Sequence, residues 1–148
     1  MRLDKESMKS FLTERLKNNH FIAHMGLILE DVDSGYAEMS LDIETHHLQQ
    51  NGFMHGGVTA TLCDVVTGIA AYTTVNEEKN VVTADLKVSY LNPSTSSKVL
   101  GVGRVVKAGK FLIFCEGQVF DVLEDGSKVL VATCTSIMAS VDIPVMNR

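Results

Sequence analysis

The first 19 residues predict a short amphipathic helix. Its apolar residues recur at steps of three and four, with charged residues between them: Met8, Phe11, Leu12 and Leu16. That spacing places them on one helical face, which can pack against a core. We expect the helix to end at Asn18-Asn19.

From Met25 onward the spacing of the apolar residues changes from the three or four of a helix to the two of a strand. The sequence Asp33-Ser34-Gly35 marks a turn, after which apolar and polar residues alternate up to Ile43. Alternation of this kind is typical of a strand with one buried and one solvated face. Two antiparallel strands are therefore expected on either side of the turn.

A helix-length stretch from about Gly57 to Thr74 is apolar almost all round. A helix without an ordinary polar face is a buried one. Its small or polar residues fall at positions i, i+4, i+7 and i+11, which is one narrow stripe: Gly57, Thr61, Asp64 and Gly68.

The remainder reads mostly as strands. Residues 81–91 alternate, with Val82, Ala84, Leu86, Val88 and Tyr90 on one face and Thr83, Asp85, Lys87 and Ser89 on the other. Further strands are expected at 99–106, 111–122 and 129–140, joined by a hairpin at 107–110 and a turn at 124–127. Residues 141–148 are expected to form a flexible tail.

The order of elements is thus helix, two strands, one buried helix and four strands. A curved antiparallel sheet wrapped round one long central helix satisfies it, because the apolar helix needs cover on most sides. This is an α+β fold. At 148 residues, a single domain spanning 1–148 is expected.

Composition narrows the class of protein. Apolar residues make up 45% and charged residues 21%, as in a soluble domain, and the net charge of −5 gives no sign of a nucleic-acid binder. Three widely spaced cysteines among apolar residues favour reduced thiols. The charged N-terminus is unlike a signal peptide, and the apolar stretch 65–75 is too short to span a membrane. A cytoplasmic protein is expected.

Asp64 is the chemical anomaly of the central helix. An ionised carboxylate inside a buried helix costs several kcal/mol unless it is paired or solvated. A functional carboxylate in a cleft is one explanation, favoured because Gly57 and Gly68 leave room on the same stripe. The alternative is that Asp64 faces solvent or bonds a neighbouring hydroxyl, Thr61 or Thr67.

The sequence His55-Gly56-Gly57 stands where this helix begins. Unpaired N–H groups at a helix start suit an oxyanion or a polarised carbonyl, and glycines allow close approach. The alternative is an ordinary glycine turn. Gly56 and Asp64 are eight residues apart, roughly 12 Å along a helix axis. One chain cannot bring both to the same small carbonyl, but a symmetric dimer with antiparallel helices could.

Three segments carry a resemblance to a known family. Residues 49–58 (QQNGFMHGGV) with 62–64 (LCD), residues 82–93 and residues 106–110 resemble hotdog-fold acyl-CoA thioesterases of the phenylacetic-acid-degradation (PaaI-like) type. The resemblance spans roughly residues 20 to 140. It implies the hotdog fold, hydrolysis of an acyl-CoA without a separate cofactor, and a homodimer with one continuous sheet, often paired into a tetramer.

The resemblance also implies roles for individual residues. Asp64 would be the nucleophile or the general base, and Gly56 would offer its N–H to the thioester oxygen. His55 would orient or polarise that carbonyl. Gln49 would contact the substrate or the attacking water, and Thr83 would position water near the acid. Some relatives carry Glu at the position of Asp64, Asn at that of Gln49 and Ser at that of Thr83. These differences leave open whether the acid is the nucleophile or the general base.

Substrate contacts follow from the same resemblance and from charge. Asn51, Gly57 and Asn92 would bind the substrate. Coenzyme A phosphates would be met by some of the basic residues, Lys107 and Lys110 first, with Lys87, Lys98 and Arg104 as further candidates. Solvated surface charge is the alternative for each. Tyr72, Phe53 and Met54 could shape an acyl pocket or simply pack in the core.

Other functions are less well supported by the sequence. A serine hydrolase would need a Gly-x-Ser-x-Gly elbow, which the chain lacks. A metal site at His46, His47 and His55 is disfavoured because adjacent histidines in a strand face opposite ways. Cys63 is better explained as a core residue than as a nucleophile. A hotdog dehydratase or hydratase, or a non-catalytic acyl-CoA sensor, remains an alternative.

Overall fold

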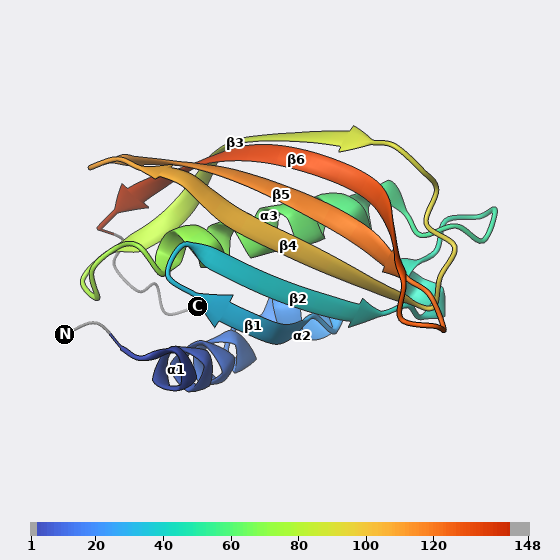
Figure 1. The fold of residues 1–148 in the computed structure, drawn as a ribbon, viewed down its shortest axis with the longest axis horizontal. Coiled ribbons are helices and arrows are strands. Elements are labelled where there is room, and N and C mark those ends of the chain that lie inside the picture. The colour runs from blue at the N-terminus through green and yellow to red at the C-terminus, as the bar shows by residue number, and fades with distance from the viewer. Residues whose placement is uncertain (1–2, 143–148) are drawn as a thin grey trace.

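The computed structural model describes residues 3–142 as one curved antiparallel sheet with helices on its concave side and at one edge (Figure 1). The helices are α1 (Lys5–Lys17), α2 (His20–Met25), the 3-10 turn η1 (Thr45–His47) and α3 (Gly56–Tyr72). The strands are β1 (Ile28–Asp33), β2 (Tyr36–Asp42), β3 (Asn80–Tyr90), β4 (Lys98–Ala108), β5 (Leu112–Val122) and β6 (Lys128–Val141). Their order in the sheet is β1-β2-β4-β5-β6-β3.

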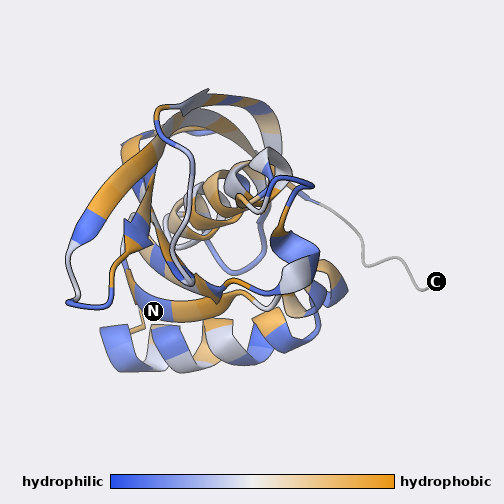
Figure 2. Cartoon of the chain, turned by 90° about the vertical axis from the view of Figure 1, so that its right-hand side faces the viewer, coloured by the Kyte–Doolittle hydropathy of each residue, from blue (hydrophilic) through white to orange (hydrophobic). Residues whose placement is uncertain are grey.

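The central helix α3 lies in the hollow of the sheet, as predicted (Figures 1 and 2). Leu62 and Val66 of α3 are fully buried against the concave face of the sheet. At Gly103 of β4 a Cβ atom would lie 2.4 Å from the Val66 carbonyl oxygen, so only glycine fits there. This close contact of backbones fixes the position of α3 over β4.

The N-terminal region contains the predicted helix and one that was not predicted. The helix α1 is capped by Asp4, whose carboxylate accepts the Ser7 N–H at 3.0 Å, and ends at Asn18. The six residues of α2 follow at once, between an Asn19 cap and Gly26 at φ 83°. A helix of six residues is too short for a period in the sequence to reveal it.

The predicted alternation of β3 is wrong in its first half. A β-bulge shifts the register, so that Thr83 lies opposite Met138 while Asp85 lies opposite Ile137. The extra residue reverses which side chains point to which face of the sheet on one side of the bulge. Val82 and Ala84 are therefore exposed rather than in the core, and Thr83 faces α3.

The connections at 107–110 and 124–127 are found as predicted. The predicted flexible tail is wrong at its start, because Val141 belongs to β6 and Asp142 forms an ion pair with Lys79 at 2.9 Å. Residues 143–148 of that tail lie outside the described residues. Among residues 3–142, no helix is long and apolar enough to cross a membrane.

Candidate active site

Asp64 is half-buried on α3 and is held by a residue from β3. The Thr83 hydroxyl donates to Asp64 Oδ1 at 2.6 Å. The neighbouring hydroxyls proposed as partners bond elsewhere, since Thr61 donates to the Gly57 carbonyl and Thr67 to the Cys63 carbonyl. No hydrogen bond to Asp64 Oδ2 is found within residues 3–142, so one oxygen is oriented and the other is available.

The start of α3 presents two hydrogen-bond donors. His55 caps the helix, and its Nδ1 accepts the Gly57 N–H at 2.8 Å. Because Nδ1 is the acceptor, the neutral ring carries its proton on Nε2 and is a donor there. The Gly56 N–H has no acceptor in the described part of the chain. Both donors suit a carbonyl oxygen that gains negative charge.

Tyr90 is a functional candidate that the sequence did not single out. Its hydroxyl donates to the Gly56 carbonyl at 2.8 Å. A Cβ atom on Gly56 would lie 3.3 Å from the Tyr90 ring, which shows how closely the ring covers this peptide. The alternating pattern placed Tyr90 on an apolar face, and 57% of the residue is exposed. The Tyr90 hydroxyl thus holds the peptide group between Gly56 and Gly57, next to the free Gly56 N–H.

A groove of about 340 Å³ opens beside Gly56. Predicted residues Gln49 and Asn92 line it together with Phe53, Met54 and Tyr90. The Gln49 side chain accepts the Asn51 N–H and so shapes the turn, whereas Asn51 itself is exposed outside the groove. The Asn92 amide donates to the Leu130 carbonyl at 2.9 Å. Of the predicted substrate contacts, Asn92 and Gln49 are thus at the groove.

Asp121 is a second candidate that no sequence signal revealed. Only 3% of it is exposed, and its carboxylate accepts from the Ser94 hydroxyl and from the Thr95 N–H at 3.0 Å. The Ser94 carbonyl in turn accepts the Met54 N–H at 3.2 Å. Asp121 therefore ties the β3–β4 loop, which lines the groove, to the segment that precedes His55.

The predicted site residues form separate groups within one chain. His55, Gly56, Gly57, Gln49 and Asn92 gather at the start of α3, while Asp64 and Thr83 meet two turns further on, roughly 12 Å along the axis. Lys107 and Lys110 are exposed on the β4–β5 hairpin, at the other end of the molecule from the start of α3 (Figure 1).

The remaining candidates have structural roles. His47 is buried, with Nδ1 accepting the Glu44 N–H and Nε2 bonded to the Met25 carbonyl at 2.8 Å, so neither ring nitrogen is available to a metal. Cys63 is fully buried, and the adjacent Cys134 thiol together with burial raises its pKa, which keeps it a neutral thiol. Within residues 3–142 no cluster of metal ligands is found.

The model of the family described as the thioesterase superfamily matches residues 51–125, which is just over half of the 148 residues. The chain belongs to the thioesterase superfamily. The matched segment contains His55, Asp64, Thr83 and Asp121. The chain is 33% identical, over 94 aligned residues, to the proofreading thioesterase EntH of Klebsiella pneumoniae, and the match covers 62% of this chain and 67% of that protein.

Solved structures agree with the fold of this thioesterase. A thioesterase family protein from Silicibacter pomeroyi is 25% identical, with a TM-score of 0.86, and the match covers 91% of this chain and 98% of that one. The PaaI protein of E. coli has the same fold at 16% identity, with a TM-score of 0.76 and coverage of 90% and 94%. The family and its thioesterase relatives establish a thioester hydrolase, rather than the hydratase or the sensor considered from sequence.

Proposed function

We propose that this thioesterase hydrolyses acyl-coenzyme A at a site shared by two subunits. Asp64 of one chain would act on a carbonyl held by Gly56 and His55 of the other. The observation that carries the proposal is the pairing of Asp64 with Thr83, which leaves one carboxylate oxygen available. The free Gly56 N–H lies roughly 12 Å away along the same helix, too far to serve that carboxylate within one chain.

The chemistry requires few groups because a thioester carbonyl is electrophilic and its thiolate leaves readily. In one route Asp64 takes a proton from water, and the oxygen adds to the carbonyl carbon. In the other, Asp64 attacks the carbonyl carbon directly, and departure of the thiolate leaves a mixed anhydride, which water then hydrolyses. In both routes the carbonyl oxygen becomes an oxyanion that Gly56 N–H and His55 Nε2–H stabilise. Collapse of this oxyanion breaks the C–S bond, and the departing thiolate takes up a proton.

Two features of the fold support a dimer. The stripe of α3 that carries Asp64 and Gly68 is only partly covered, although the rest of the helix is buried. The strand β3 lies at the edge of the sheet, with Val82 39% exposed. A partner related by two-fold symmetry could continue the sheet at this edge and lay its own α3 antiparallel. Pairing of two such dimers is part of the proposal.

Coenzyme A phosphates are proposed to contact Lys107 and Lys110. Both are exposed on the β4–β5 hairpin, and neither forms an ion pair within residues 3–142. Gln49, Asn51, Gly57 and Asn92 are proposed to contact the pantetheine or acyl part of the substrate, near the groove beside Gly56. The substrate brings its own coenzyme, so no further cofactor is proposed.

The test is release of free thiol from a panel of acyl-CoA substrates. We expect Asp64→Asn to lower kcat by about 10²–10⁴-fold, since general acid–base catalysis contributes on that scale. Asp42→Asn is the matched control, because Asp42 is an exposed carboxylate at the end of β2, away from β3 and outside the groove beside Gly56. Its activity should match wild type. Folded wild-type protein that releases no thiol from any acyl-CoA would refute the proposal.

A further inference from the structure

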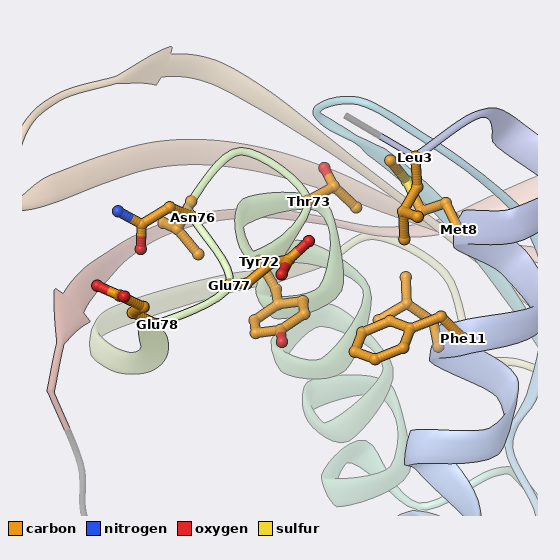
Figure 3. Close-up of a pocket in the computed structure, with 10 residues that line it drawn as sticks. Leu3, Met8, Phe11, Tyr72, Thr73, Asn76, Glu77 and Glu78 are labelled. Carbon is orange, nitrogen blue, oxygen red and sulfur yellow. The ribbon is translucent and has the colours of Figure 1, made fainter. Parts of the chain in front are cut away.

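A second groove lies between α1 and the C-terminal end of α3 (Figure 3). It has a volume of about 580 Å³, larger than the groove beside Gly56. Its apolar lining comes from both helices and the turn after α3: Leu3, Met8, Phe11, Leu12, Tyr72 and Val75. Leu3 is 40% and Phe11 47% exposed, so apolar surface is left open to a ligand.

The groove adjoins the face of α3 that carries Asp64. Tyr72 follows Asp64 by eight residues, with Gly68 midway, and these positions lie within the partly covered side of the helix. The distance is roughly 12 Å along the axis. Gly68 has no side chain to obstruct this path, and a Cβ there would meet only Met138 at 3.8 Å. A chain extending from a thioester at Asp64 could therefore reach the groove.

The wall formed by α1 is held in place by polar contacts. Lys5 forms an ion pair with Asp31 at 2.9 Å, which anchors the start of the helix to β1. Near its end, Arg15 donates to the Asn80 side chain at 2.7 Å and lies 4.9 Å from the Tyr72 ring centroid. The groove is thus a feature of the fold with contacts at both ends.

We propose that this groove binds the distal part of a fatty-acyl chain, which makes medium-chain and longer acyl-CoAs the preferred substrate class. The inference rests on the proposed acyl-CoA thioesterase function. With C–C bonds of about 1.5 Å, roughly ten chain carbons span the distance from Asp64 to Tyr72. Shorter acyl groups and aryl-acyl groups would not enter the groove.

Charge at the rim indicates which part of the substrate enters. Glu77 and Glu78 also line the groove, and Figure 3 shows Glu77 beside Tyr72 and Glu78 further from α1. Their carboxylates would repel the phosphates of coenzyme A, whereas the hairpin lysines Lys107 and Lys110 would attract them. An uncharged hydrocarbon chain meets no charge repulsion from these carboxylates and gains from contact with the apolar walls.

The test compares kcat/KM for thiol release from butyryl-, octanoyl-, dodecanoyl- and phenylacetyl-CoA. Wild type should prefer dodecanoyl-CoA over butyryl-CoA by at least about tenfold, since each buried methylene contributes about fourfold. Phe11→Glu should reduce that preference by about tenfold or more and leave butyryl-CoA hydrolysis unchanged. Phe21→Glu is the matched control, because Phe21 is also exposed, at 57%, and lies outside the groove. It should keep the wild-type preference.

Different failures have different meanings. Equal rates for butyryl- and dodecanoyl-CoA, or the same loss on every substrate in both variants, would overturn the groove assignment and leave the thioesterase proposal intact. A clear preference for phenylacetyl-CoA would do the same. Absence of thiol release from every acyl-CoA would overturn the proposed function, and the groove assignment with it.

Discussion

Gly56 contributes one backbone N–H to the proposed site, and a substitution by proline can remove this donor without removing any other hydrogen-bond donor. It is the first residue of α3, where proline is well tolerated, and His55 before it is extended at ψ 137°. We expect Gly56→Pro to fold normally and to lower kcat by about 10²–10³-fold, the usual cost of losing one oxyanion donor. Thiol release and the melting temperature would be measured together.

The control for this substitution is Gly56→Ala. Alanine introduces a Cβ against the Tyr90 ring, at 3.3 Å, as proline also does, but it keeps the N–H. If the N–H stabilises the oxyanion, the alanine variant should retain most of its activity. Equal losses in both variants would instead attribute the effect to crowding of Tyr90.

Thr83 provides a second test at the residue scale. Thr83→Val keeps the shape of the side chain and removes the hydroxyl that orients Asp64. We expect kcat/KM to fall by about tenfold or more, because a hydrogen bond to a charged group contributes about 1.5 kcal/mol or more. Thr83→Ser, which restores the hydroxyl, should recover most of the activity. A valine variant as active as wild type would show that Asp64 is oriented by other means.

At the scale of elements, the contact of α3 with β4 depends on glycine. Gly103→Ala would place a Cβ 2.4 Å from the Val66 carbonyl oxygen, so the helix or the strand must shift. Overpacking of this kind costs about 1–3 kcal/mol or more, and thermal unfolding should show a clearly lower melting temperature.

The elements also show where sequence patterns succeed and fail. The central helix was predictable because apolar residues surround it, and Asp64 was conspicuous for that reason. The bulge in β3 was not predictable, since Ala84 fits a regular alternation as well as it fits a bulge. Asp121 was hidden because its partners are loop groups about 25 residues away, which no local period reveals.

At the scale of the whole molecule, the two halves of the proposed site are separated by the length of α3 between them. Neither half can act alone, because a carboxylate without an oxyanion donor lacks stabilisation of the transition state. In the proposed dimer, two-fold symmetry would supply both halves twice, each from a different chain. Because β3 lies at the edge of the sheet, its free edge is open to pairing with a second chain.

A shared site predicts that two inactive variants rescue each other. When Asp64→Asn and Gly56→Pro chains are unfolded together and refolded, mixed dimers contain one intact site and one that lacks both groups. With random pairing, about a quarter of wild-type activity should return, since half of the dimers are mixed and each has one working site of two. Separately refolded variants, combined only before the assay, are the control and should stay inactive. If co-refolding restores nothing although mixed dimers form, then Asp64 and Gly56 do not act across the interface, and each site would have to be complete within one chain.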